Sequence, residues 1–146
     1  MKVNKSVTIR ATSGNHVDTI VQANDSKDHV FTITAESVKL SGFTIKGAKG
    51  DKKAGIHISS SNNRITDNNA TSNFIGIALS GSRENKIINN TANSNRYAGL
   101  ALLFSSDNNT IEGNNATDNK IGLIFYPFGG GSFNTIQAVP HLPNNQ

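Results

Sequence analysis

The chain has 146 residues, of which 35% are hydrophobic and 16% charged, with a net charge of +4 and no cysteine. This length suits one domain, the lack of cysteine excludes disulfides and thiolate metal sites, and no apolar run of ~18 residues is present to span a membrane. The basic residues are scattered, and their one cluster, KGAKGDKK, has no interleaved aromatic residues. We therefore expect no nucleic-acid partner.

The N-terminal region predicts short strands. Its start, MKVNKSVTIRATSG, lacks the apolar segment of a signal peptide, so we expect a leader and a first segment to precede it. Alternating apolar residues predict strands within SVTIRA, TIVQA and HVFTITAESVKLSGFTIKG. Loops are expected to project from residues 10–18 or 22–29 and from residues 48–53.

From residue 55 onward the sequence repeats. The segments GIHI, GIAL, GLAL and GLIF begin at residues 55, 76, 99 and 122, at spacings of 21, 23 and 23 residues, and each is followed by Asn-x-Ile. Their apolar residues alternate with the period of two that marks a strand with one buried face. A repeat of ~22 residues with short strands between corners is typical of one coil of a β-solenoid.

Asparagines and apolar residues recur in register with this repeat. Asn tolerates left-handed backbone angles and hydrogen-bonds its own turn, and stacked Asn side chains can hydrogen-bond along a stack, as in cross-β structures. One apolar column is predicted to contain Ile9, Leu40, Ile65, Ile87, Ile111 and Ile136. Three structural ladders are predicted: Asn63, Asn85, Asn109 and Asn134; Asn68, Asn90 and Asn114; and Asn73, Asn95 and Asn119.

The segments GIALSGSRENKIINNTANSN and GLALLFSSDNNTIEGNNATDN resemble the repeats of NosD-like proteins of the carbohydrate-binding and sugar-hydrolase (CASH) group. The order SVTIRATSG, DTIVQA, HVFTITAESVKLSGFTIKGA resembles the N-terminal coils of cell-surface proteins of methanogenic archaea. The resemblance covers about residues 3–137. It implies an all-β, single-stranded, right-handed parallel β-helix of the pectate-lyase type with about five coils. We expect the helix to occupy residues 1–137, with a tail at 138–146, in an extracellular or cell-surface protein.

Enzymes of this fold that act on polysaccharides place acids on neighbouring coils. In the predicted register no column has acids on two adjacent coils, and Asp67 and Glu112 stand two coils, ~10 Å, apart. That separation exceeds the retaining geometry of glycosidases and is marginal for the inverting one. The Asp-Pro-His-Glu signature of the alginate-epimerase branch is absent. We predict no catalytic residue, and a polysaccharide lyase, epimerase or glycosidase stays an alternative.

Metal ligands are sparse. The NosD name is tied to copper-site assembly, yet His16, His29, His57 and His141 each stand alone, and the chain has one Met. We therefore expect no metal and no cofactor. The oxygens of Asn24, Asp25 and Asp28 leave open a Ca²⁺ site, beside the alternative that this loop only turns.

Aromatic residues gather toward the C-terminal end. Aromatic rings beside polar side chains suit a shallow saccharide platform, because sugar C–H faces stack on rings while hydroxyls hydrogen-bond. The alternative is that these rings cap the last coil. The candidate ligand-binding residues are Arg96, Tyr97, Phe104, Tyr126, Phe128 and Phe133.

The leading functional hypothesis is a non-catalytic module that contacts a polysaccharide or cell-envelope glycan, or that serves as a structural spacer. A further alternative is a self-assembling unit. Coils at the ends of a β-helix offer unpaired strand edges, so separate molecules can stack head to tail into fibres.

Overall fold

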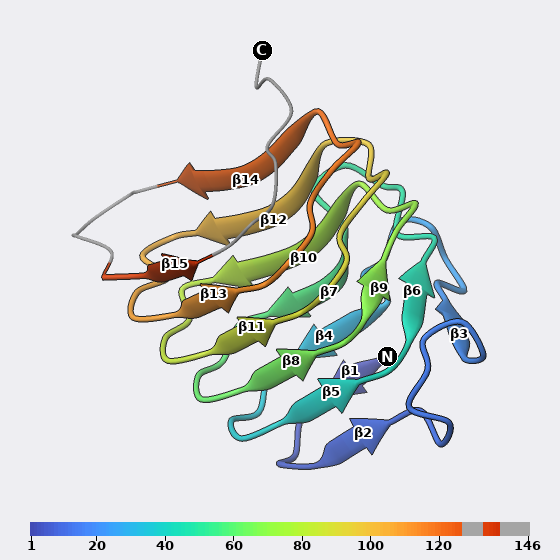
Figure 1. Cartoon of the computed structure of the whole chain (residues 1–146), viewed down its shortest axis with the longest axis horizontal. Helices are drawn as coiled ribbons and strands as arrows, with labels where there is room; N and C mark the ends of the chain where they lie inside the picture. Colours follow the sequence, from blue (N-terminus) through green and yellow to red (C-terminus); the bar gives the residue numbers. More distant parts are fainter. Residues whose placement is uncertain (127–132, 138–146) are drawn as a thin grey trace.

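The structure is a computed structural model that describes residues 1–126 and 133–137. The chain winds as a right-handed parallel β-helix of about five turns, which confirms the predicted fold (Figure 1). Each turn passes through a front sheet, a short strand on the right-hand side and a back sheet, and then rises toward the next turn (Figure 1). Among the described residues no helix is long and apolar enough to cross a membrane.

Three parallel sheets form the walls. Sheet A has the order β1 (Lys2–Val3), β4 (Phe31–Ile33), β7 (Ala54–Ile58), β10 (Ile75–Ser80), β12 (Ala98–Leu103), β14 (Ile121–Tyr126). Sheet B has the order β2 (Thr8–Arg10), β5 (Lys39–Ser41), β8 (Arg64–Thr66), β11 (Lys86–Ile88), β13 (Thr110–Glu112), β15 (Thr135–Gln137). Sheet C contains β3 (Ile20–Gln22), β6 (Thr44–Lys46) and β9 (Asn69–Ala70), and single bridges through Thr91 to Asn115 continue it.

The register of sheet B confirms the predicted apolar column. Ile9 pairs with Leu40, Leu40 with Ile65, and the pairing continues through the later coils to Ile136. Ile65 and Ile87 are fully buried, whereas Ile136 in the last described strand is 40% exposed. The core therefore lies between sheets A and B and closes best in the middle coils.

Glycines at the start of the sheet A strands permit close approach between coils. A Cβ built on Gly76 would lie 2.6 Å from the carbonyl oxygen of Gly99 and 2.9 Å from Nδ2 of Asn95. Beyond this glycine Ile77 faces the main core, while Ile75 and Ala78 belong to a second apolar cluster. The strand thus turns two consecutive residues, Gly76 and Ile77, toward the interior.

The asparagine columns lie at the corners, as predicted, and they are buried except for Asn119 and Asn134 at their C-terminal ends, which are partly buried. Asn90 is 1% exposed, and its Oδ1 accepts the backbone N–H of Asn68 at 3.0 Å. Its Nδ2 donates to the carbonyl oxygen of Ile65 at 2.9 Å. The backbone leaves the sheet here, and the Asn side chain replaces the missing ladder partner.

The bonding differs in one respect from the expected ladder of side-chain amides. The recurring bond in all three columns runs from a backbone N–H to the Asn oxygen of the next coil. Direct bonds between side chains add to it in the first two columns, as from Asn68 Nδ2 to Asn90 Oδ1 at 3.1 Å. The ladders are therefore chiefly links between side chain and backbone.

Candidate functional site

The outer face of sheet A carries an apolar cluster separate from the core. Its buried members are small or aliphatic, and its partly buried members include two aromatic residues that pack on them. None of the six strands of sheet A contains Asp or Glu. The buried members are Ala54, Ile75, Ala78, Ala98 and Ala101, and the partly buried members are Phe74, Tyr97, Leu103, Ile121 and Ile124.

Two aromatic rings cover part of this face. Phe74 and Tyr97 stand immediately before β10 and β12, and their rings stack with centroids 5.3 Å apart at an interplanar angle of 17°. The Arg96 guanidinium carbon lies 5.8 Å from the Phe74 centroid, and Lys120 Nζ lies 5.9 Å from the Tyr97 centroid. Both distances allow cation–π attraction.

Tyr97 and Tyr126 connect opposite ends of the outer face. A hydrogen bond with Tyr126, followed by burial, raises the pKa of Tyr97 above its ordinary value. Tyr126 pairs in register with Leu103 at the far end of β12, whereas Tyr97 precedes that strand. Tyr126 and Tyr97 thus belong to the two ends of the outer face, on either side of Ala101, which is fully buried.

The structure thus brings together three of the six candidate ligand-binding residues, Arg96, Tyr97 and Tyr126. Phe104 directly follows β12 and Phe133 precedes β15, and these two are 59% and 80% exposed. Both belong to the corner between sheets A and B, away from the Phe74–Tyr97 stack. Phe128 lies outside the described residues.

Sequence reasoning missed Phe74. A signal was present, because NFIGIAL and RYAGLAL both place an aromatic residue just before the sheet A strand. We call Phe74, Tyr97 and Tyr126, with the neighbouring cations Arg96 and Lys120, the aromatic strip.

Two histidines lie on the same wall. His29 and His57 stack with ring centroids 4.3 Å apart, and the Ala54 N–H donates to His29 Nδ1 at 2.9 Å. Burial, His57 and Lys53 lower the pKa of His29 to about 4. Burial and Lys53 also lower the pKa of His57. The expectation that each histidine stands alone is wrong for this pair, because the register of sheet A places them on neighbouring coils.

These histidines do not fit a copper centre of the kind that the NosD resemblance implies. Imidazole nitrogens bind a metal within the ring plane, and rings inclined by only 20° in a face-to-face stack aim their lone pairs side by side rather than at one point. His29 Nδ1 is also occupied by a backbone N–H. In the described part of the chain, no three His, Asp or Glu side chains are placed to share a metal ion.

The loop with the candidate Ca²⁺ ligands forms a turn. Asp25 Oδ1 accepts the Lys27 N–H at 2.9 Å, as in an Asx turn. Asn24 and Asp25 line a shallow hollow together with Lys49. The positive charge of Lys49, which lines this hollow, disfavours the binding of Ca²⁺ there.

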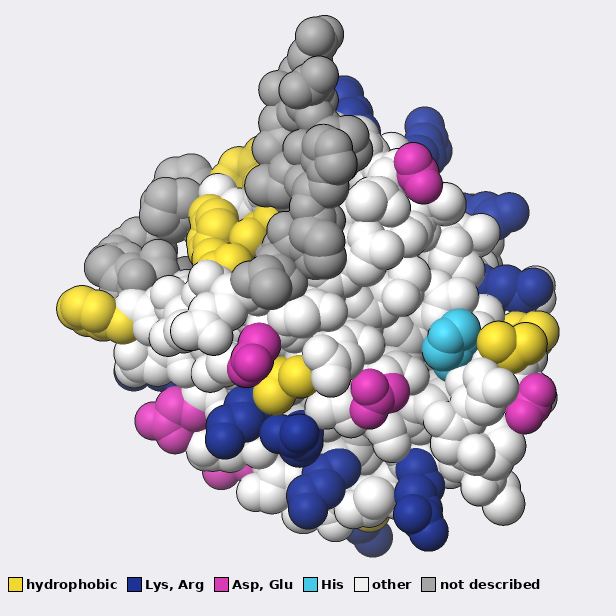
Figure 2. All heavy atoms as spheres, in the orientation of Figure 1, with side chains coloured by type: hydrophobic (Ala, Val, Ile, Leu, Met, Phe, Trp, Pro, Cys, Tyr) yellow, Lys and Arg dark blue, Asp and Glu magenta, His cyan; other side chains and the backbone are white. Residues whose placement is uncertain are grey.

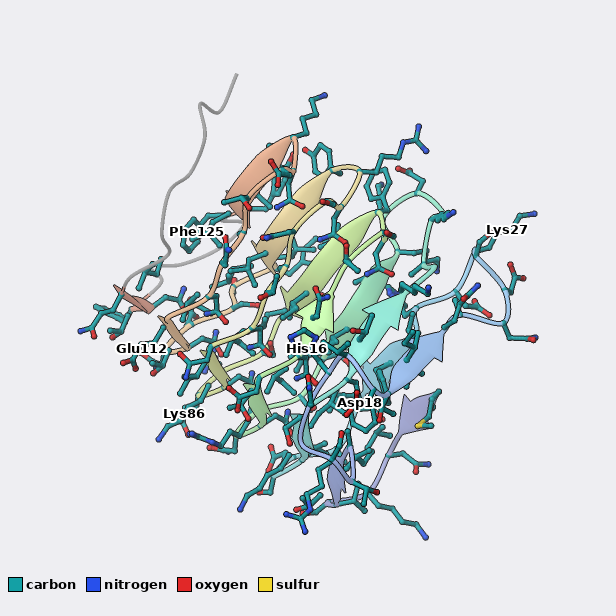
Figure 3. The ribbon with its side chains drawn as sticks, turned by 45° about the vertical axis from the view of Figure 1, so that its right-hand side comes forward. His16, Asp18, Lys27, Lys86, Glu112 and Phe125 are labelled. Atoms are coloured by element: carbon teal, nitrogen blue, oxygen red, sulfur yellow. The ribbon has the colours of Figure 1, made fainter. Side chains whose placement is uncertain are left out.

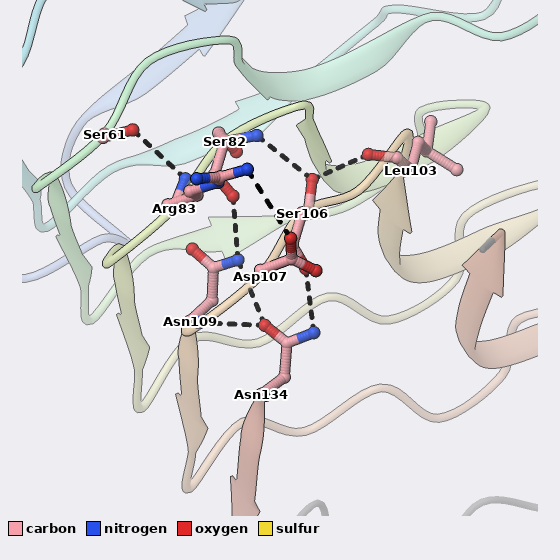
Figure 4. Close-up of polar contacts among 8 residues, drawn as sticks. All are labelled: Ser61, Ser82, Arg83, Leu103, Ser106, Asp107, Asn109 and Asn134. Atoms are coloured by element: carbon pink, nitrogen blue, oxygen red, sulfur yellow. Dashed lines mark hydrogen bonds and ion pairs between the residues drawn. The ribbon is translucent and has the colours of Figure 1, made fainter. Parts of the chain in front are cut away.

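Glu112 is the one acid within the six described strands of sheet B. Glu112, labelled in Figure 3, has Ile88 and Gln137 as its partners in the column. The ion pair found within residues 1–126 and 133–137 joins Arg83 to Asp107 at 3.9 Å (Figure 4). It lies at the corner between sheets A and B, beside the bond from Asn109 N–H to Asn134 Oδ1 (Figure 4).

Comparison with known proteins is informative at the level of family. No curated protein and no solved structure shows a significant match. The sequence model of one family, described as "Periplasmic copper-binding protein (NosD)", matches residues 1–138. That match spans nearly the whole chain and agrees with the observed parallel β-helix. The chain therefore belongs to the NosD family.

Proposed function

We propose that this chain is a non-catalytic module of an extracellular, periplasmic or cell-surface protein, and that it contacts glycan through the aromatic strip. The observation that carries the proposal is the composition of the outer face of sheet A. Aromatic rings, two cations and tyrosine hydroxyls meet there, on strands without acidic residues. Family membership supports the location, because the family description is periplasmic.

The chemistry of the strip suits a sugar. C–H faces of a pyranose stack on aromatic rings, while hydroxyls hydrogen-bond to phenol, guanidinium and ammonium groups. Tyr126 is 45% exposed and offers the most open ring. A strip on a flat sheet contacts a few sugar units of a longer chain, so we expect weak, extended binding.

The test is isothermal titration with neutral and acidic oligosaccharides, chosen after a screen on a glycan array. We expect Tyr126→Ala to weaken binding about threefold to tenfold, since one aromatic contact contributes about 0.5–1.5 kcal/mol. Phe133→Ala, which removes an exposed ring at another place, is the matched control and leaves binding unchanged. Binding to no glycan, or equal losses in both variants, would refute the proposal.

A second candidate, self-association by coil stacking, rests on the first coil. Val7 and Ile20 in this coil are 40% and 56% exposed, and β1, β2 and β3 are the end strands of their sheets among the described residues. Another coil from a second copy would pair with these edges. Sedimentation at increasing concentration should show growing species, and a monomer at every concentration would exclude this role.

A further inference from the structure

Sheet B carries a row of cations on its outer face. The residue before each member of the apolar column points outward, and at three consecutive coils that residue is basic. Lys39 pairs with Arg64, and Arg64 pairs with Lys86, with neighbouring strands ~4.8 Å apart. All three are exposed. We call these residues the cationic column.

The cationic column has no internal compensation. Like charges facing one another on adjacent strands are destabilising. No ion pair to any of the three occurs within residues 1–126 and 133–137, where Arg83–Asp107 is the pair found. The strands β2, β5, β8 and β11 contain no acid, and Arg10 adds a cation in the neighbouring outward column, where it pairs with Ser41. Figure 2 shows Lys and Arg side chains gathered on the lower front of the molecule, and Figure 3 shows Lys86 pointing into solvent.

The neighbouring outward column on the same face carries hydroxyl groups beside Lys39 and Arg64, and Ile88 stands beside Lys86. Ser41 and Thr66 stand two residues after Lys39 and Arg64, at the other ends of β5 and β8. Their side chains lie on the same side of each strand as the cations. A ligand along the cationic column would therefore meet charges on one side and hydroxyl groups on the other.

We infer that the cationic column binds a linear acidic polysaccharide, with its carboxylates following the row along the solenoid axis. A straight row of unpaired cations at a fixed spacing matches a chain that repeats its negative charge. The guanidinium of Arg64, at the centre of the row, can donate two hydrogen bonds to one carboxylate. Ser41 and Thr66 supply hydrogen-bond partners for sugar hydroxyls. Single-stranded nucleic acid is less suited, because its binding sites use aromatic stacking and β5, β8 and β11 carry no aromatic residue.

This site lies on a different sheet from the aromatic strip. It goes beyond the proposed function and does not depend on it. A variant of the aromatic strip still has an intact cationic column, and a variant of the cationic column still has an intact aromatic strip. Failure of the proposed function and failure of this inference can therefore be distinguished.

The test titrates the protein with an oligogalacturonate of defined length at low ionic strength. The variant Lys39→Gln/Arg64→Gln/Lys86→Gln should bind roughly tenfold more weakly or worse, since each exposed ion pair contributes a few-fold. The control variant Lys27→Gln/Lys49→Gln/Lys52→Gln removes the same charge from exposed loop positions and should change affinity less than about twofold. Added salt should weaken wild-type binding, because exposed charges are screened.

A second readout separates a binding role from a structural one. Because the column is repulsive without ligand, Arg64→Thr should raise the melting temperature of the free protein while it weakens oligogalacturonate binding. A variant that merely damages the fold lowers both quantities.

Three results would overturn the inference. The first is no binding of oligogalacturonate, or binding no tighter than that of a neutral glucan of equal length. The second is an equal loss of affinity in the column variant and the control variant, which would indicate a general effect of net charge. The third is tighter binding of single-stranded DNA or of phosphatidylglycerol vesicles through the same three residues, which would assign the column to a different class of partner.

Discussion

The two N-terminal coils and the later coils differ in the residues that satisfy the backbone at their corners. At the three corner columns the later coils have Asn, whereas the coil of β4, β5 and β6 has Val38, Phe43 and Ala48. Each of these apolar residues donates its backbone N–H to the Asn oxygen of the next coil, as Val38 does to Asn63 at 2.8 Å. Each asparagine thus accepts a hydrogen bond from the backbone of the coil that precedes it in the chain.

This direction explains why apolar residues are tolerated at the lower end of each ladder. A residue in a ladder column needs a side-chain amide only where a backbone N–H of the preceding coil has to be hydrogen-bonded. The first coil is irregular at these corners. The N-terminal coils are also less closed, with Val17 66% exposed. The comparison teaches that the core closes best in the middle coils, where the ladders are established on both sides.

The largest effect is expected from breaking a ladder in its middle. Asn90→Ala leaves the backbone N–H of Asn68 without its acceptor and removes the Nδ2 donor to the carbonyl oxygens of Ile65 and Ile88, of which Ile88 keeps the Asp67 N–H. Each such buried group costs about 1–3 kcal/mol, so we expect the free energy of unfolding to fall by about 4 kcal/mol. Urea denaturation measures this change.

The matched control for that variant is Asn62→Gly. Asn62 is exposed and has a φ of 59°, which glycine adopts freely. Its free energy of unfolding should stay within about 0.5 kcal/mol of the wild type. A loss in Asn90→Ala as small as that of this control would mean that the buried amides contribute little.

The apolar column offers a direct comparison between the two regions. Ile87 is fully buried in the later coils, whereas Ile9 in the first coil is only partly buried. Ile87→Ala should cost about 3 kcal/mol of unfolding free energy, and Ile9→Ala about 1 kcal/mol. Equal losses at the two positions, measured by urea denaturation, would show that the first coil is as well packed as the middle.

A smaller effect is expected at the glycines. Gly76→Ala places a methyl group 2.6 Å from the Gly99 carbonyl oxygen, and overpacking of this kind costs about 2 kcal/mol. Gly14→Ala in the first coil meets no atom within 4 Å and is penalised by its φ of 69°, about 1 kcal/mol. Thermal melting of both variants tests the order, and a larger loss at Gly14 would contradict the close approach between coils.

The smallest effect is a pH dependence from the stacked histidines. Their native pKa values lie below the ordinary 6.5, at about 4 for His29. The unfolded chain therefore binds more protons in this range, and the stabilisation is complete above pH 6.5 and is lost as the pH falls toward 4. The melting temperature of the wild type should fall more steeply over this range than that of His29→Gln/His57→Ala. Parallel curves for the two proteins would rule out a contribution from the stack.

The fold was predictable because every coil repeats the same requirements. Each corner must satisfy its backbone and each wall must bury an aliphatic residue, so Asn68, Asn90 and Asn114 recur at matched places, as do Ile65, Ile87 and Ile111. The direction of the Asn hydrogen bonds was not predictable, because it depends on how each amide is turned inside the corner.

The candidate site was harder to predict because its positions do not repeat. The position of Phe74 and Tyr97 is occupied by Lys53 and Lys120 in the flanking coils, as the pairing of the adjacent strands shows. The cationic column did have a signal, since Arg64 and Lys86 occupy the middle of Asn-x-Ile. Charges counted along the chain look scattered, and only the register of sheet B places them in one row.

The most direct test of the central claim, that Asn side chains hold the backbone of the preceding coil, is hydrogen exchange of individual backbone amides. The Asn68 N–H lies at a corner and bonds to Asn90 Oδ1 at 3.0 Å. We predict that it exchanges as slowly as amides within the sheet B strands, and that Asn90→Ala accelerates it more than it accelerates amides of the first coil. Rapid exchange of Asn68 in the wild type, at the rate of an exposed loop, would contradict the account.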